Sequence, residues 1–487
     1  MSHPPIPEFS FLGSRTFLAR FFARPVRRFL RIQASGGMLM LAATVAALVW
    51  ANSRWSHGYE SFWHTPIDIS VGSFHLGGGH HLDLRAIVND GLMAIFFFVV
   101  GLEIKRELVT GQLRTVKAAA LPAIAALGGM VVPAAIYLAF TSGTDASNGW
   151  GIPMATDIAF AVGLVSLLGS RVDRKLLVFL LSLAIVDDLG AIAVIALFYA
   201  ETISMGWLAT ACAILALTIM VRVVRVWYIP VYALLGVALW VATLQSGLHA
   251  TIAGVLLGVI TPARPIQTQA QVRKWVDWLR DKDDEIMAVD VNYAAFHIRE
   301  AHSVAERVIT ALHPLSSFVI VPLFAMANAG IPLSGSVLAD SASASVTWGV
   351  AMGLVVGKAV GITAFTWVGI RLGLAALPSG MNMRHVGALA AISGVGFTVA
   401  LFVTGLAFTN EVFQTQAKIG ILGGSAVAGV GGLALMAMAT RPSGSAEEDS
   451  GDRPAIAHEP TAAERAGNGV ETPGRRRDAS VAVGGKS

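Results

Sequence analysis

The sequence predicts an all-α membrane protein with twelve membrane-spanning helices. Of its 487 residues, 55% are hydrophobic and only 14% are charged, whereas soluble domains contain roughly 25% charged residues. Fifteen charged residues lie in 263–312 and fifteen in 441–487, so charge is scarce elsewhere. The remainder divides into apolar runs close to the roughly 20 residues that cross a bilayer as a helix.

The predicted spans form one membrane domain over 36–440. It follows a basic N-terminal segment, 1–35, and the absence of a convincing cleavage site favours a retained first helix over a signal peptide. The spans are 36–52, 86–104, 117–140, 151–169, 176–200, 205–221, 228–245, 247–262, 315–331, 347–370, 385–409 and 416–440.

The charges of the loops support this count. Lys and Arg recur in alternate loops from the N-terminus to the tail, and they are absent from 141–150, 201–204, 332–346 and 410–415. By the positive-inside rule, both termini face the cytoplasm. The basic residues are spread over short loops, so no nucleic-acid partner is expected. The single cysteine excludes an intramolecular disulfide.

Three segments are predicted to lie outside the bilayer. Residues 67–76 alternate between apolar and polar and are followed by three glycines, which predicts a short periplasmic β-hairpin. Segment 263–312 is predicted to be a polar cytoplasmic insert, helical in part. The tail, 441–487, is rich in Gly, Ser, Pro and mixed charge, and is predicted to be disordered.

Four ionisable residues remain in the middle of predicted spans. They are Asp157, Asp187, Asp188 and Lys358. Each costs roughly 2.5–3.5 kcal/mol on insertion scales, so such residues usually have a function. The alternative is a purely structural ion pair between the aspartates and the lysine.

Asp187 and Asp188 are adjacent and point about 100° apart on one helix. Both cannot comfortably stay ionised in a medium of low dielectric constant. The pair can therefore hold protons or exchange them for a small cation, because carboxylate oxygens are the ligands that hard cations prefer. Proton and cation would then compete for one site.

Helix-breaking residues lie beside these charges. Pro153 precedes Thr156 and Asp157 in the fourth span, and Gly394 and Gly396 lie within the eleventh. Such residues often only allow close packing, but here they also favour two interrupted helices whose half-helix ends carry partial charge. The corresponding interruptions predict inverted repeats, spans 3–5 and 10–12.

Six long motifs resemble those of the NhaA-type sodium/proton antiporters of bacterial inner membranes, and the resemblance covers roughly 33–440. This family is itself a standard example of inverted repeats and broken helices, so these two features are not independent of the resemblance. The motifs are FFFVVGLEIKREL at 96–108, ATDIAFA at 155–161, LAIVDDLGAI at 183–192, SGLHATIAGV at 246–255, PLFAMANAG at 322–330 and SGVGFT at 393–398.

The resemblance implies electrogenic exchange of cytoplasmic sodium or lithium for external protons, without a cofactor and active at alkaline pH. It implies that Asp187 and Asp188 bind cation and proton alternately. Thr156 and Asp157 match the residues at the crossing of the broken helices, and Lys358 matches a lysine that pairs with the first aspartate or balances the helix dipoles. It also implies a homodimer formed partly through the hairpin at 67–76.

The resemblance further links Glu103, Glu107 and His249 to pH response, although a histidine near a helix start is as often structural. The chain departs from the family at two places. Ala359 follows the lysine where proline is common, and Ile309 stands where an acidic residue is expected. The shape of the lysine helix and the pH threshold are therefore open.

Three other functions were weighed. An intramembrane aspartyl protease needs a G-x-G-D motif, whereas Val186 precedes Asp187. A retinal-type pump also uses an intramembrane lysine, but it has seven spans and not twelve. A passive cation channel lined by carboxylates is harder to separate by sequence.

Overall fold

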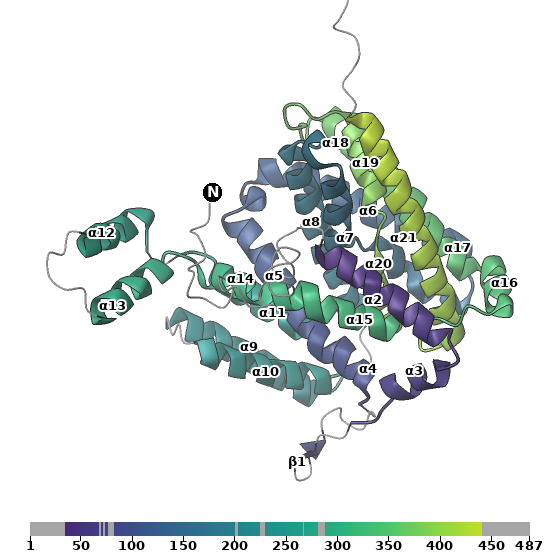
Figure 1. Cartoon of the computed structure of the whole chain (residues 1–487), viewed down its shortest axis with the longest axis horizontal. Coiled ribbons are helices and arrows are strands. Elements are labelled where there is room, and N and C mark those ends of the chain that lie inside the picture. Colours follow the sequence, from purple (N-terminus) through teal and green to yellow (C-terminus); the bar gives the residue numbers. More distant parts are fainter. Residues whose placement is uncertain are drawn as a thin grey trace, which may run out of the picture. The chain divides into compact units, whose positions relative to one another are not determined.

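The computed structural model describes residues 35–67, 70–71, 74–75, 82–199, 203–224, 229–265, 267–280 and 288–440. In these ranges the regular structure is helical apart from two short strands and one isolated bridge (Figure 1). The N-terminal segment and the tail lie outside them, so the predictions made for those segments stay predictions.

The predicted β-hairpin over 67–76 is not seen as such. The described residues contain only β1 (Ser70–Val71) and β2 (Phe74–His75), two residues each, paired antiparallel. The rest of this segment lies largely outside the described residues. Because an isolated two-stranded ribbon is marginally stable at best in water, an alternating pattern by itself was a weak reason to expect longer strands.

Helices in the first half of the chain overlap the first six predicted spans. Helix α2 (Ser35–Ala51) is separated by a 116° bend from the short helix α3 (Ser56–Trp63). The elements that follow are α4 (Leu84–Ala86), the π-helical turn η2 (Ile87–Leu92), α5 (Met93–Val109), the 3-10 turn η3 (Gln112–Arg114), α6 (Val116–Thr141), the 3-10 helix η4 (Asp145–Met154), α7 (Ile158–Leu167), the 3-10 turn η5 (Gly169–Arg171), α8 (Arg174–Phe198) and α9 (Met205–Val223).

The second half contains fourteen further elements among the described residues. They are α10 (Ile229–Gln245), α11 (Thr251–Ile260), α12 (Gln269–Arg280), α13 (Ala288–Arg299), α14 (Val304–Leu315), the π-helical turn η6 (Ser316–Ile320), α15 (Val321–Asn328), α16 (Gly335–Ser343), α17 (Ser345–Met352), the π-helical turn η7 (Gly353–Gly357), α18 (Lys358–Arg371), α19 (Met383–Ile392), α20 (Phe397–Ala407) and α21 (Glu411–Ala439). Two groups of them form continuous spans, Val304–Asn328 and Ser345–Arg371.

The predicted insert 263–312 contains α12 and α13 but also overlaps the start of the Val304–Asn328 span. Glu306, Arg307 and His313 lie in α14. These polar residues interrupt the apolar run in the first turns of the helix. The apolar pattern therefore predicts a span that begins at 315, whereas the helix begins at Val304.

In the part of the chain that the structure describes, seven helices are long and apolar enough to cross a membrane, or up to ten spans if each bent pair counts as one. The two other predicted spans, 228–245 and 247–262, correspond to α10 and α11, with 17 and 10 residues. Ten helical residues are only about 15 Å long. The hydrocarbon core is about 30 Å thick, so α11 cannot cross it unaided.

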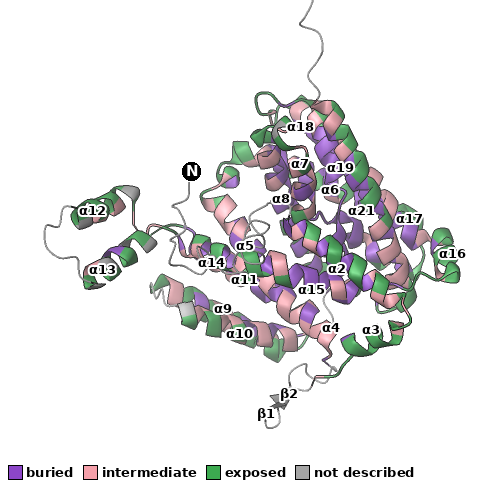
Figure 2. Cartoon of the chain, viewed as in Figure 1, coloured by how far each residue is buried: buried purple, intermediate pink, exposed green. Residues whose placement is uncertain are grey.

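Burial separates core helices from peripheral ones (Figure 2). All residues of α20 from 397 to 404 are buried, as is 61% of the apolar stretch of α8. In α9, which packs against α10, only Ala211 and Thr218 are buried among the described residues. Most apolar side chains of α9 therefore face the surroundings, whereas the first two turns of α20 and most of the apolar stretch of α8 are enclosed by protein.

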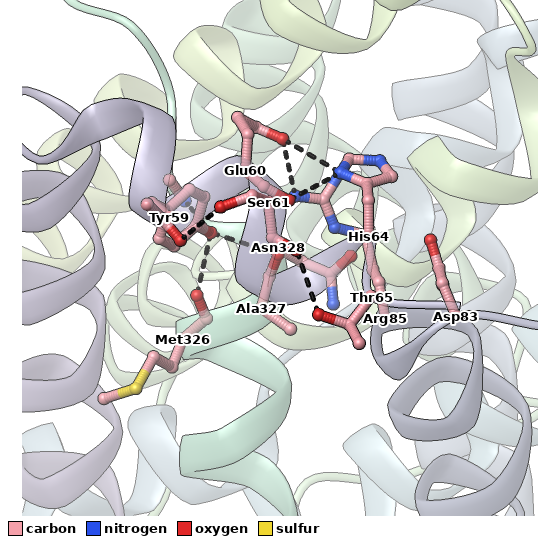
Figure 3. Close-up of polar contacts among 12 residues, drawn as sticks. Tyr59, Glu60, Ser61, His64, Thr65, Asp83, Arg85, Met326, Ala327 and Asn328 are labelled. Atoms are coloured by element: carbon pink, nitrogen blue, oxygen red, sulfur yellow. Dashed lines mark hydrogen bonds and ion pairs between the residues drawn. The ribbon is translucent and has the colours of Figure 1, made fainter. Parts of the chain in front are cut away.

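Polar contacts attach the bend between α2 and α3 to the end of α15 (Figure 3). The hydroxyl of the buried Tyr59 lies 2.8 Å from the carbonyl oxygen of Met326 and accepts a hydrogen bond from the backbone N–H of Gly330. The side-chain amides of Asn89 in η2 and Asn328 in α15 bond to each other. α15 is thus held from two sides while it also packs against α2 and α20.

Candidate functional site

Both predicted helix interruptions lie within bent helix pairs. η4 and α7 are bent by 44° at residues 155–157, and α19 and α20 are bent by 52° at residues 393–396. Pro153 lies in η4, and Thr156 and Asp157 lie in the break itself. Gly394 and Gly396 lie in the second break.

The two breaks contact each other. The backbone N–H of Asp157 donates to the carbonyl oxygen of Val395 at 2.7 Å, and the Thr156 hydroxyl lies 3.0 Å from the carbonyl oxygen of Ser393. A Cβ atom at Gly396 would lie 2.5 Å from the carbonyl oxygen of Ala155. The absence of a side chain at this glycine therefore permits the close approach of the two backbones.

Asp157 has hydrogen bonds on both carboxylate oxygens. Its Oδ1 accepts from the backbone N–H of Phe160 at 3.1 Å, which caps α7. Its Oδ2 accepts from the backbone N–H of Thr398 at 3.2 Å and from the Thr398 hydroxyl. The N-terminal ends of α7 and α20 thus both point at this carboxylate, where their partial positive charge stabilises it.

Lys358 forms an ion pair with Asp187 in the protein interior. Its Nζ lies 2.5 Å from Asp187 Oδ2, and the two side chains are 0% and 2% exposed. The hydroxyl of Thr156 lies 2.7 Å from the same oxygen. The ion pair between an aspartate and the lysine, which the sequence left open as an alternative, is therefore present. Both contacts are made to Oδ2 of Asp187 and neither is made to Oδ1.

The helix that contains Lys358 has a defined shape although Ala359 stands where proline is common in the family. Lys358 directly follows η7, a π-helical turn, and is the first residue of α18. A Cβ atom at Gly357 would lie 2.7 Å from Pro133 Cα in α6. The local shape of this helix therefore depends on a wide turn packed closely against α6, with no proline after the lysine.

Two buried oxygens next to these groups have no hydrogen-bond partner among the described residues, Asp187 Oδ1 and Asp188 Oδ1. A buried polar atom without a partner costs roughly 1–3 kcal/mol. The described residues contain no group of three or more His, Cys, Asp or Glu side chains that could hold a metal ion. Any cation bound here would therefore take its charged ligands from few carboxylates.

The three residues linked to pH response lie in two places: Glu103 and Glu107 are one helical turn apart on α5, and His249 lies just before α11. Glu107 Oε2 accepts from the backbone N–H of Gln112 at 2.8 Å and so stabilises the turn after α5. Glu103 is half-buried on the same helix. His249 Nε2 lies 2.5 Å from the carbonyl oxygen of Tyr199, after the end of α8.

Two residues of this region were not predicted as site residues, Thr398 and Tyr199. Thr398 lies in the SGVGFT motif, and a hydroxyl two residues after the last glycine was a usable signal. The Tyr199 hydroxyl donates to the carbonyl oxygen of Asn148 at 2.7 Å and accepts from Gly151 N–H at 3.1 Å. It thus attaches η4 to α8, and burial raises its pKa to about 12.

Comparison with known proteins identifies the family. The family model described as Na+/H+ antiporter 1 matches residues 27–436. The chain is 45% identical to Na(+)/H(+) antiporter NhaA 3 of Frankia alni, over 85% of this chain and 88% of that protein. It is 44% identical to NhaA of Rhodopirellula baltica (85% and 93%) and to NhaA 2 of Myxococcus xanthus (90% and 94%). The chain therefore belongs to the NhaA-type Na+/H+ antiporters, multi-pass secondary transporters whose transported ions are Na+ and H+.

Proposed function

We propose that this antiporter works by competition of Na+ or Li+ with protons for Asp187 and Asp188. The observation that carries the proposal is that each aspartate has a buried carboxylate oxygen to which no described residue donates a hydrogen bond. An exchangeable positive species is the simplest partner for such atoms. Because two bare negative charges repel strongly in a medium of low dielectric constant, the site holds either protons or the cation.

The neighbouring groups have separate roles in this mechanism. Lys358 balances the charge of Asp187 while no cation is bound, and the hydroxyl of Thr156 steadies the same oxygen. A cation that enters beside Asp188 also lies close to the Asp187 carboxylate. Its positive charge partly neutralises that carboxylate and so weakens the attraction between Lys358 and Asp187. Asp157, with Gly394 and Gly396, keeps the two helix breaks together and favours their crossing.

The finer architecture is proposed on the same basis. The two bent pairs lie at corresponding places in spans 3–5 and 10–12, which supports inverted repeats. Counting α10 and α11 as the remaining spans gives twelve, and the loop charges then put both termini in the cytoplasm of a bacterial inner membrane. A homodimer is proposed from the family resemblance.

The direction and pH response complete the proposal. Cytoplasmic Na+ or Li+ leaves as a larger number of external protons enters, so the exchange is electrogenic. Activity rises at alkaline pH because protons then release the aspartate pair more readily. Glu103, Glu107 and His249 are proposed to adjust this response, and His249 contacts the residue whose hydroxyl attaches η4 to α8.

Exchange across everted membrane vesicles tests the function. With an imposed pH gradient, addition of Na+ or Li+ should collapse the gradient and K+ should not, increasingly as the pH is raised. Clamping the membrane potential should change the rate if the exchange is electrogenic. A passive cation channel would carry Na+ without moving protons, and a gradient unaffected by Na+ and Li+ at every pH would contradict the proposal.

A further inference from the structure

We propose that α12 and α13 together form an amphipathic helix pair that lies on the lipid bilayer surface, with its apolar face buried at the boundary between the lipid headgroups and the acyl chains. We call these two helices the insert pair. The inference depends on the multi-pass architecture and is independent of the proposed ion site. It concerns the polar insert, for which the proposed function has no role.

The base of the insert pair is closed by bonds between its two ends. Glu300 and Arg307 form an ion pair of 2.7 Å in which their side chains are only 11% and 16% exposed. The backbone N–H of Gln267 donates to the carbonyl oxygen of Glu300, and that of Ala305 to the carbonyl oxygen of Pro262. α12 begins two residues after this closed base, and α13 ends one residue before it.

The closed base lies where a membrane span begins. Val304 is the first residue of the candidate span Val304–Asn328, and the apolar helix α11 ends at Ile260. The ends of a membrane-spanning helix lie at the interface between water and lipid. The insert pair is therefore attached within a few residues of that interface, at both of its ends.

Helix α12 is amphipathic along its whole length. At about 100° per residue, its apolar side chains occupy one continuous arc and its charged side chains occupy the other side. The basic residues stand at the borders of the apolar arc and Asp277 stands in the middle of the polar side, an arrangement typical of helices that lie in the interface. The apolar residues are Val272, Trp275, Val276 and Trp278, and the basic residues are Arg273, Lys274 and Arg280.

Helix α13 adds an exposed apolar stripe. Val289, Tyr293 and Phe296 follow the spacing i, i+4 and i+7, and they are 73%, 53% and 58% exposed. The rings of Trp275 and Tyr293 lie 5.3 Å apart, which joins the stripe to the apolar arc of α12. Ala294, elsewhere on α13, is 1% exposed. The two helices thus pack on each other and still expose a common apolar surface.

The chemistry of this surface favours lipid as its occupant. Tryptophan and tyrosine are enriched at membrane interfaces, and arginine and lysine at the border of an apolar face can extend to the phosphates. From 269 to 299 the sequence holds five basic and six acidic residues. Binding should therefore come from apolar burial and depend little on anionic lipid.

Spin labels on the full-length protein in liposomes test the proposal. Cys212 is first replaced by serine, and a nitroxide is then attached at Val289→Cys, with Asp277→Cys on the polar side as the matched control. Dissolved oxygen and a water-soluble nickel complex report depth in the bilayer. The label at 289 should lie about 5–10 Å below the headgroup level, with a severalfold lower nickel-to-oxygen collision ratio than the label at 277.

The same ratio should be found in zwitterionic and in anionic liposomes. In a Val289→Cys protein that also carries Phe296→Asp and Val276→Asp, the label should become accessible to nickel while exchange of Na+ for H+ continues. Equal nickel accessibility at 277 and 289 in the parent protein would overturn the proposal. Dipolar broadening between labels at 289 would also overturn it, in favour of a second copy as the occupant.

Discussion

Asp157 and Asp188 are buried to nearly the same degree, 4% and 6% exposed, yet their carboxylates differ in how many hydrogen bonds they accept. Every oxygen of Asp157 accepts a hydrogen bond, from Phe160 or from Thr398. Within the described part of the chain, Asp188 keeps one buried oxygen without a hydrogen-bond partner, and so does its neighbour Asp187. Burial alone therefore does not distinguish these carboxylates; their hydrogen bonds do, and the aspartates of α8 that keep an oxygen without a partner are the ones that we propose as the ion site.

The difference follows from where each residue lies. Asp157 lies at a helix break, where free backbone N–H groups surround it. Asp188 lies inside the continuous helix α8, whose N–H groups already bond to its own carbonyls. A carboxylate on such a helix must find side chains, backbone from elsewhere, a proton or a cation. The five predictions below test this contrast, from the largest expected effect to the smallest.

Replacement of Asp188 by asparagine should abolish exchange while the protein stays folded and membrane-inserted. The amide keeps the shape but can neither lose a proton nor supply a full negative charge to a cation. Dequenching of a pH-sensitive dye in everted vesicles measures the loss. Asp173→Asn is the matched control, because Asp173 caps the same helix from an exposed position and asparagine caps equally well. Full exchange by Asp188→Asn would refute the site.

Gly396→Ala should both destabilise the protein and strongly reduce exchange. The new Cβ would lie 2.5 Å from the Ala155 carbonyl oxygen, so the crossing of the breaks would have to open. Overpacking of this kind costs roughly 1–3 kcal/mol. Gly405→Ala in α20, the helix that follows this break, is the control, because outside its own helix backbone no atom of the described residues lies within 4 Å of its Cβ position. Equal melting temperatures of the two variants would show that the close approach is unimportant.

Lys358→Met should lower the apparent affinity for Na+ and move the pH profile of exchange upward. Without the ammonium group, the negative charge of Asp187 is no longer balanced, and its proton is given up only at higher pH. Lys358→Arg retains the charge and should shift the profile less. Measurement of exchange from pH 6.5 to roughly 9 resolves the shift. An unchanged profile in the methionine variant would reject the electrostatic role of Lys358.

Asp157→Asn and Thr398→Val should weaken the fold more than the ion binding. In the first variant an NH₂ group faces N–H donors, which costs roughly 1–3 kcal/mol, and in the second the hydrogen bond from the hydroxyl to the carboxylate, worth roughly 1.5–3 kcal/mol, is lost. A double-mutant cycle on thermal stability should give a coupling of at least about 0.5 kcal/mol. Additive effects would mean that the two residues do not act together, and the contrast between Asp157 and Asp188 would lose its basis.

The smallest effect is expected at Tyr199, which lies just outside α8. Its folded pKa of about 12 exceeds the ordinary value of 10.0, so the unfolded chain loses this proton first. The stability that this group contributes is complete below pH 10 and is lost as the pH rises through about 12. The melting temperature of Tyr199→Phe should therefore fall less than that of the parent protein as the pH rises from 10 to about 12. Identical curves for both proteins between these values would contradict the assignment.

Sequence patterns identified the charges and the breaks but not the atoms that join them. Two adjacent aspartates in an apolar run, and Pro and Gly beside other charges, follow directly from residue types whose presence in lipid is costly. The contacts of Thr398 with Asp157, and of Tyr199 with η4, depend on how separate helices cross. No spacing along the chain encodes such a crossing.

Hydropathy was least informative where short or mixed segments were involved. It predicted a span over 247–262, of which α11 supplies only ten helical residues, and it predicted a start at 315 for the next span, although α14 begins at Val304 and contains Glu306 and Arg307 in its first turns. It also could not foresee the π-helical turns, because the residues of η7 are as apolar as those of an ordinary helix. Such turns arise from packing between helices, here of Gly357 against Pro133.

The turn η7 has a consequence for how the chain tolerates changes in length. A π-helical turn accommodates one surplus residue within an otherwise α-helical run. Loss of a single residue from Gly353–Gly357 would let the helix close into ordinary α-geometry without breaking. The two flanks would keep their present orientation, because the residue removed is the surplus one, and Lys358 would still face Asp187. Loss of one residue from the regular helix α18 would instead rotate everything beyond it by about 100°. A one-residue deletion should therefore be better tolerated within this turn than one turn further along the same span.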